Sequence, residues 1–251
     1  MPALCRPEQQ KSEMKRICLL IICMLLSASP VEAGETEQDG RDDMKIIWIG
    51  HSCFKIESDG FALILDPYED GYVPGLKPLR ESADMVLCSH EHGDHNAKDL
   101  IEITEGQSCP FTITTIDTFH DEVQGAKRGP DTIHIIDDGS FRIAHLGDLG
   151  CELEEDQIEQ LKNLDVCMIP VGGYYTIDGK QAAQLVHQIQ PRVVLPMHYR
   201  DDKAGFGFDV ISTVEDFAES MDSVVRLDQS ALSMDDLPDA QVVILSPRDA
   251  S

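Results

Sequence analysis

Hydrophobic and polar positions alternate along the first part of the chain in short runs that predict β-strands. Strand-type runs occur at residues 45–49, 53–56, 61–65, 85–88, 111–114, 132–136 and 141–146. The sequences Ser58-Asp59-Gly60 and Asp137-Asp138-Gly139 separate two pairs of runs and predict hairpin turns. Helices expected at 153–164, 180–190 and 212–221 then alternate with strands at 166–170, 192–195, 224–227 and 241–245. This order predicts one α/β domain over residues 44–251, with two β-rich layers and helices outside.

Residues 1–33 are expected to lie outside this domain. The basic pair Lys15-Arg16 precedes an apolar run at 17–26, and Val31-Glu32-Ala33 completes the pattern of a secretory signal peptide cleaved after Ala33. The apolar run is short for a membrane span, although an uncleaved anchor is the alternative. Residues 34–43 are polar and predict a flexible tail. We therefore expect an exported protein, periplasmic or extracellular, without stable membrane association after cleavage.

The composition supports a folded core and narrows the partners. Of the 251 residues, 42% are hydrophobic, and the formal net charge is -26. So many negative charges argue against nucleic acid and anionic membrane surfaces as partners, because both repel an acidic protein. A small-molecule substrate is expected, and the sequence does not indicate the oligomeric state.

The candidate chemistry is concentrated in the hexapeptide His90-Glu91-His92-Gly93-Asp94-His95. It follows a strand-type run and precedes residues 97–101, which predict a helix. His90 and His92 point the same way in an extended segment, and Gly93 can turn the chain so that Asp94 and His95 face a second ion. Imidazole and carboxylate ligands together suit zinc, manganese or iron. The alternative is a polar loop with scattered histidines.

Further candidates stand at the ends of predicted strands or at glycine-containing turns, where α/β proteins place their sites: Asp66, His120, Asp148 and His198. His51 follows the first strand and either lines a cleft and binds substrate or caps a turn. His145 lies three residues before Asp148 and either orients a ligand or packs within its strand.

These motifs resemble the metallo-β-lactamase superfamily, and within it the compact branch that includes ascorbate-phosphate lactonase. The matching pieces, in the family's order, are LILDP at Asp66, HEHGDH, TFHD at His120, HLGD at Asp148 and PMHY at His198. The resemblance implies a four-layer αβ/βα sandwich with two metals in a cleft at its edge. The implied ligands are His90, His92 and His120 for the first metal, Asp94, His95 and His198 for the second, and Asp148 as the bridge. Asp66 is implied to orient the ligand loop.

The expected function is that of a binuclear metal-dependent hydrolase of small ester, lactone or phosphate-ester substrates. Two cations about 3.5–4 Å apart share a water and lower its pKa, so that the resulting hydroxide attacks a carbonyl or phosphoryl centre. Asp94 and Asp148 are the expected catalytic residues, and zinc is the first choice of metal, with manganese or iron as alternatives. The rival functions are a di-iron redox enzyme and a non-catalytic metal- or ligand-binding protein of the same fold.

Two basic spots and one aromatic loop bear on the substrate. Lys127-Arg128 and Tyr199-Arg200 are rare basic spots in an acidic chain, and an anionic substrate would need such groups near the metals. Ordinary solvated charges are the alternative. The loop Gly172-Gly173-Tyr174-Tyr175 resembles a cleft-lining segment, whose tyrosines either touch substrate or only pack.

Overall fold

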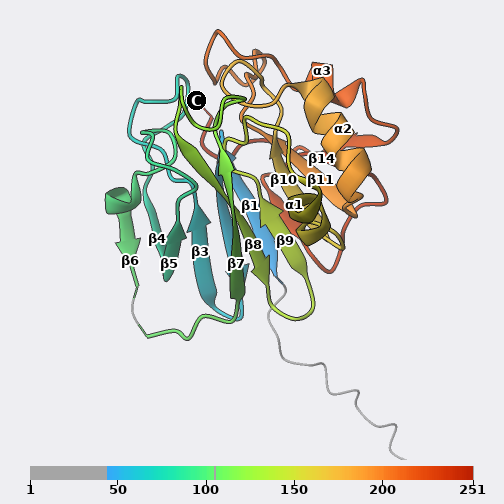
Figure 1. The fold of residues 1–251 in the computed structure, drawn as a ribbon. Coiled ribbons are helices and arrows are strands. Elements are labelled where there is room, and N and C mark those ends of the chain that lie inside the picture. Colours follow the sequence, from blue (N-terminus) through green and yellow to red (C-terminus); the bar gives the residue numbers. More distant parts are fainter. Residues whose placement is uncertain (1–43, 105, 251) are drawn as a thin grey trace, which may run out of the picture. The chain divides into compact units, whose positions relative to one another are not determined.

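The computed structural model describes residues 44–104 and 106–250 (Figure 1). The predicted signal peptide at 1–33 and the predicted tail at 34–43 lie outside the described residues and stay predictions. Among the described helices, none has the length and apolar character needed to cross a membrane.

Two large sheets and one small sheet form the framework. The five-stranded sheet has the order β13-β1-β2-β3-β5, the seven-stranded sheet has the order β12-β14-β11-β10-β9-β8-β7, and β4 pairs with β6. The strands of the five-stranded sheet are β1 Lys45–Gly50, β2 Cys53–Ser58, β3 Phe61–Leu65, β5 Met85–Leu87 and β13 Ala231–Ser233. Those of the seven-stranded sheet are β7 Thr112–Phe119, β8 Pro130–Asp137, β9 Arg142–His145, β10 Val166–Pro170, β11 Val193–Met197, β12 Val224–Arg226 and β14 Val242–Ile244. The small sheet consists of β4 Glu81–Ala83 and β6 Ile101–Ile103.

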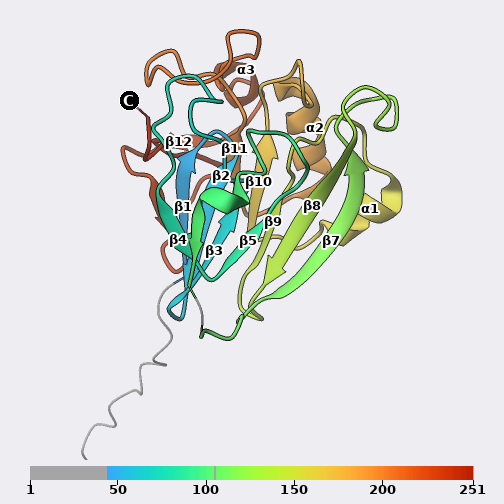
Figure 2. The same ribbon diagram turned by 90° about the vertical axis from the view of Figure 1, so that its left-hand side faces the viewer.

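The α-helices of the described residues lie outside the seven-stranded sheet (Figures 1 and 2). They are α1 Glu155–Gln160, α2 Gly179–Ile189 and α3 Glu215–Ala218, and a 3-10 turn, η1, covers Lys98–Leu100. Asp178 caps α2, because its side chain accepts hydrogen bonds from the backbone N–H groups of Lys180 and Gln181. The apolar face of α2 is buried, and one continuous hydrophobic cluster joins both large sheets.

Strand direction explains why the candidate ligands meet. β1 and β3 flank β2 in antiparallel pairing and β5 runs parallel to β3, so the carboxyl ends of β1, β3 and β5 share one edge. The same holds for β7, β9 and β11, since β8 is antiparallel to both neighbours and β9, β10 and β11 are parallel. His51, Asp66, the hexapeptide, His120, Asp148 and His198 all follow these six ends.

The predicted fold class is confirmed, while several boundaries were wrong. The second half of β7 escaped prediction, because its alternation of Thr and Asp with Ile and Phe carries a weak apolar signal. The predicted helices at 153–164 and 212–221 are shorter, and the first ends before Asn163, which adopts a left-handed conformation (φ 58°). The expected helix at 97–101 is only the turn η1, after which Ile101 enters β6. The strands β4, β6 and β13 were missed, because three-residue strands depend on their partners rather than on local pattern.

Candidate metal centre

The predicted ligands converge on one carboxylate. The Nε2 atoms of His95, His120 and His198 each lie 3.2 Å from Asp148 Oδ2, and His90 Nε2 lies 3.9 Å from the same oxygen. His90, His92 and His120 also offer ring nitrogens within 4.8 Å of one another, as the first predicted site requires. A second set of ligand atoms within that distance comes from His51, Asp94, His95 and His198. The structure therefore brings all seven predicted ligands together, and Asp148 stands between the two sets.

Several inward-facing atoms of this cluster have no hydrogen-bond partner among the described residues. They are His90 Nε2, His95 Nε2, His198 Nε2 and Asp148 Oδ1, all of them buried. A buried polar atom without a partner costs free energy on the order of 1–3 kcal/mol, and four such atoms facing one another are rare in a folded protein. This donor set is the one that divalent transition metals take, so the residues fit a metal centre.

Asp66 supports His95 from behind. It is fully buried at the end of β3, and its Oδ2 accepts hydrogen bonds from His95 Nδ1 (2.7 Å) and Ser89 Oγ (2.6 Å), while Oδ1 accepts from Ser89 N (2.7 Å). Burial opposes its ionisation, but His145 and His95 together with these hydrogen bonds lower the pKa of Asp66 to about 2. A charged Asp66 keeps the proton of His95 on Nδ1 and leaves Nε2 free to bind metal.

Asp131 and Ser89 play the corresponding part for His90, and sequence reasoning missed both. Ser89 Oγ lies 2.9 Å from His90 Nδ1, and Asp131 Oδ1 lies 3.4 Å from the same nitrogen. Asp131 Oδ1 also accepts a hydrogen bond from the backbone N–H of Asp148 (3.0 Å). The available signal was a charged residue at a buried position of β8, since Asp131 stands beside the apolar run 132–136.

His51 is buried away from solvent rather than exposed in a cleft. Its Nε2 lies 3.3 Å from Asp94 Oδ2, and its carbonyl accepts a hydrogen bond from Trp48 Nε1. Burial, together with neighbouring His198, lowers the pKa of His51 to about 4, so the ring is neutral at physiological pH. This placement favours orientation of Asp94 over contact with substrate.

His145 contacts the turn that carries Asp148. Its Nδ1 accepts a hydrogen bond from Gly147 N (3.2 Å), its Nε2 lies 2.9 Å from Ser52 O, and its Nδ1 lies 3.9 Å from Asp66 Oδ2. The ring therefore links the turn after β9 to the turn after β1, and it acts on Asp148 through Gly147.

Backbone strain marks the same region. His51, Asp66 and His198 adopt left-handed conformations with φ of 53°, 45° and 52°. Gly93, expected to provide the turn in the hexapeptide, does not have a positive φ; a Cβ there would lie 2.6 Å from Cε2 of Tyr72. Its role is to let the Tyr72 ring approach the backbone beside the metal ligands.

A cavity of about 200 Å³ opens onto the ligands. Four predicted ligands line it, and four further residues complete the lining: Tyr72, Arg128, Tyr175 and Phe208. Three of these residues are aromatic, and Arg128 brings a positive charge. Tyr175 was foreseen as a cleft residue, whereas Tyr72 and Phe208 had no signal in the sequence beyond being aromatic residues in loops. Tyr174 is 65% exposed and does not line the cavity.

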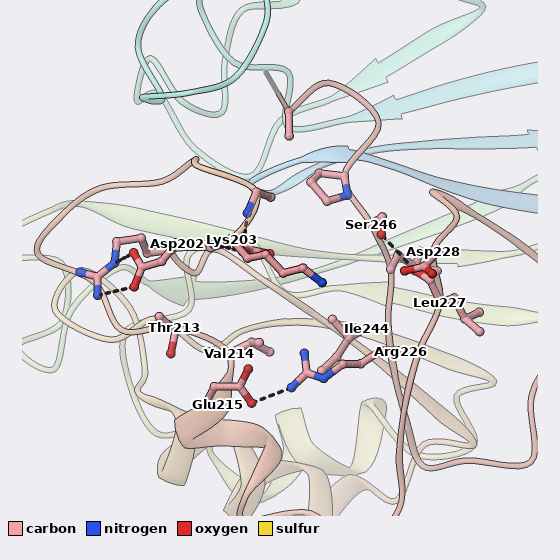
Figure 3. Close-up of a pocket in the computed structure, with 16 residues that line it drawn as sticks. Asp202, Lys203, Thr213, Val214, Glu215, Arg226, Leu227, Asp228, Ile244 and Ser246 are labelled. Atoms are coloured by element: carbon pink, nitrogen blue, oxygen red, sulfur yellow. Dashed lines mark hydrogen bonds and ion pairs between the residues drawn. The ribbon is translucent and has the colours of Figure 1, made fainter.

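A larger cavity of about 710 Å³ lies elsewhere, lined by residues 200–204, 213–215, 226–228 and 244–247 and by Ala250 (Figure 3). Its basic residues are mostly paired, since Arg226 bonds Glu215 (2.6 Å) and Arg200 bonds Asp202 (2.7 Å). None of the predicted ligands lines it. The candidate metal site therefore opens onto the smaller cavity.

The sequence and the fold of this chain are similar to those of known proteins. A family model described as "Beta-lactamase superfamily domain" matches residues 45–198, a range that includes every predicted ligand. A UPF0173 protein of Pyrococcus abyssi is 30% identical over 185 residues, covering 62% of this chain and 83% of the relative. A UPF0173 metal-dependent hydrolase of Methanopyrus kandleri is 27% identical over 194 residues, covering 62% of this chain and 84% of the relative. The crystal structure of a Thermotoga maritima protein assigned to the metallo-β-lactamase superfamily is similar with a TM-score of 0.63 and 29% identity, covering 80% of this chain and 98% of that one.

Proposed function

Because this chain belongs to the beta-lactamase superfamily and is a metal-dependent hydrolase of that family, we propose that it binds two divalent metals and hydrolyses a small ester, lactone or phosphate ester. Zinc is the proposed metal, with manganese or iron as alternatives, because the donors are imidazole and carboxylate. Export from the cytoplasm is part of the proposal and rests on the sequence pattern of residues 1–33.

The ligands divide between the two ions as follows. His90, His92 and His120 would hold one ion, Asp94, His95 and His198 would hold the other, and Asp148 would contact both. Two such ions lower the pKa of a shared water and stabilise the negative charge that develops on the substrate oxygen.

The protein's own residues prepare that chemistry by orientation. Asp66 fixes the tautomer of His95, and Ser89 with Asp131 holds the ring of His90. Each support leaves the inward nitrogen unprotonated, which is the form that binds metal. Asp94, held by His51, lies at the cavity wall and is the proposed acceptor for a proton from the attacking water.

The observation that carries this proposal is the set of unpartnered nitrogens around Asp148. Without an ion, the Nε2 atoms of His95 and His198 would each lie 3.2 Å from one carboxylate oxygen without a hydrogen-bond partner, and His90 Nε2, 3.9 Å from that oxygen, would lack one as well. A purely structural cluster would satisfy these atoms with protein donors and acceptors.

Elemental mass spectrometry of the purified protein tests the proposal, beside Asp148→Ala and the control Asp222→Ala, which removes an exposed carboxylate outside the site. We expect about two metals per chain in the wild type and the control, as in binuclear hydrolases, and a clear loss in Asp148→Ala. Hydrolysis of aryl esters, lactones and phosphate esters by the metal-loaded protein is then measured. Less than about one metal per chain after reconstitution would contradict the two-metal mechanism, and a predominance of iron would favour the redox rival.

A further inference from the structure

We propose that Arg128 binds a carboxylate or phosphate group of the substrate, so that the preferred substrates carry an oxyanion in addition to the bond that is cleaved. This inference rests on the proposed function, because it names the substrate class of the same cavity. The observations that carry it are the position of Arg128, its lack of a carboxylate partner and the rigidity of its loop.

Arg128 is the only lysine or arginine among the described residues that line the metal cavity. Its guanidinium donates one hydrogen bond, from Nη2 to Tyr174 O (2.9 Å), and lies 5.5 Å from the ring centroid of Tyr175. No carboxylate of the described chain pairs with this side chain, although the protein has 46 acidic residues. Its remaining N–H donors are therefore available to a ligand, and their planar fork matches the geometry of an oxyanion.

Neighbouring basic residues differ from Arg128 in this respect. Lys127 forms an ion pair with Glu122 and is more than half exposed, outside the cavity lining. Arg200, the other basic spot noted in the sequence, bonds Asp202 and the carbonyl of Asp209. The anion site is thus assigned to Arg128, and Lys127 offers a matched control from the same loop.

The loop that carries Arg128 is built around one buried carboxylate. Asp121 Oδ1 accepts backbone hydrogen bonds from Val123 and Gly125, and Oδ2 accepts from Lys127 (2.8 Å) and Arg128 (2.7 Å). Asp121 directly follows His120, so one loop places both a metal ligand and the arginine. A site that is rigid before binding loses little entropy when it captures its ligand, as a specificity-determining group requires.

The space around Arg128 suits a small substrate with a flat apolar portion. Tyr72, Tyr175 and Phe208 supply aromatic rings to the lining of the cavity of about 200 Å³. A second groove of about 490 Å³ adjoins it, since His92 and Arg128 line both spaces, and Lys98 adds another positive charge there. An oxyanion held by Arg128 would sit at the junction of the two spaces, with the cleavable bond toward the metals.

Calorimetry on the zinc-loaded full-length protein tests the inference without requiring turnover. The probes are benzoate and phenyl phosphate, with benzamide as the neutral counterpart of benzoate. The proteins are wild type, Arg128→Gln, Arg128→Lys and the control Lys127→Gln. We expect at least one anionic probe to bind Arg128→Gln about tenfold more weakly than it binds wild type and Lys127→Gln, because a charge-assisted, two-pronged contact is lost. Arg128→Lys should fall between, since it keeps the charge and loses the fork.

The outcomes separate clearly. Equal dissociation constants for Arg128→Gln and Lys127→Gln with both anions would overturn the inference, and so would an equal loss of benzamide binding. The tighter of the two anions distinguishes a carboxylate from a phosphate substrate. If Arg128→Gln binds less zinc than wild type, the anion affinities of Arg128→Lys and wild type are compared instead. Equal anion affinities in these two proteins would refute a two-pronged contact from the guanidinium.

A turnover comparison keeps this inference apart from the proposed function. Hydrolysis of 4-acetoxybenzoate and of its neutral methyl ester is measured, and the ratio of their kcat/KM values should fall in Arg128→Gln and hold in Lys127→Gln. Absence of hydrolysis with either ester, together with loss of the expected metal content, would count against the proposed function. A kcat/KM ratio that is the same in all variants would count against Arg128 alone.

Discussion

The substitution Asp66→Asn tests how the protein prepares a ligand before any metal arrives. Asp66 accepts three short hydrogen bonds, of 2.6–2.7 Å, from Ser89 and His95. An asparagine can keep one oxygen on Ser89 N, but its amide nitrogen then faces His95 Nδ1 as a donor. His95 must therefore either bury an unpaired Nδ1–H or move its proton to Nε2, the atom that faces Asp148.

The magnitude follows from either response. Leaving one buried donor unpaired costs about 1–3 kcal/mol, and loss of an outer partner of a metal-ligating histidine typically weakens metal affinity about 10–100-fold. The two figures agree, because 10–100-fold corresponds to about 1.4–2.7 kcal/mol. We therefore expect the second metal to bind Asp66→Asn about 10–100-fold more weakly, with the first metal affected less.

A competition titration against a chromophoric chelator measures both metal affinities, with circular dichroism to establish that the variant is folded. Asp222→Asn is the matched control, because it makes the same chemical change at an exposed position outside the site. A folded Asp66→Asn protein whose second metal binds as tightly as in the control would refute the tautomer argument.

Three further perturbations follow from the same geometry. Asp121→Asn should loosen the loop that places His120 and Arg128, because an amide nitrogen cannot accept hydrogen bonds from the two N–H groups now bound to Oδ2. We expect weaker metal binding and faster cleavage within residues 121–129 in limited proteolysis, and an unchanged digestion pattern would contradict this. Gly172→Ala would place a Cβ 2.1 Å from His198 O, so we expect a loss of about 1–3 kcal/mol in unfolding free energy by urea titration, and a neutral result would show that the strand end can shift. Removing metal with a chelator should lower Tm, because ions that bind only the folded state stabilise it; an unchanged Tm in differential scanning calorimetry would argue against tightly held ions.

Much of the site could be predicted from the sequence because each candidate ligand lies next to a recognisable motif or strand pattern. The hexapeptide places four ligands within six positions, and His120, Asp148 and His198 each follow a run with a recognisable strand pattern. Parallel strand direction then brings those ends to a common edge. The hairpins and most of the strands were predictable for the same reason, since alternation and turn residues are local signals.

The rest depends on contacts between distant segments. Ser89 and Asp131 support His90 through side-chain orientations that no spacing rule gives, and Asp131 lies far along the chain, in β8. His51 could be read either way until its burial and its contact with Asp94 were visible. Arg128 was recognisable as a rare basic residue, but only the fold shows that it lines the cavity of the candidate ligands while Lys127 pairs with Glu122.

The left-handed backbone at His51, Asp66 and His198 sets a limit on engineering this protein. A glycine at such a position relieves roughly 1–2 kcal/mol of steric cost, so a search for heat-resistant variants guided by backbone conformation alone would select glycine at all three, although at Asp66 it would also leave the buried donors of Ser89 and His95 unpaired. Each of those gains would remove a side chain that holds or aligns the ions. Relief of backbone strain and retention of the candidate metal centre therefore oppose each other at these three positions, and stabilising substitutions are better sought in the outer helices and surface loops.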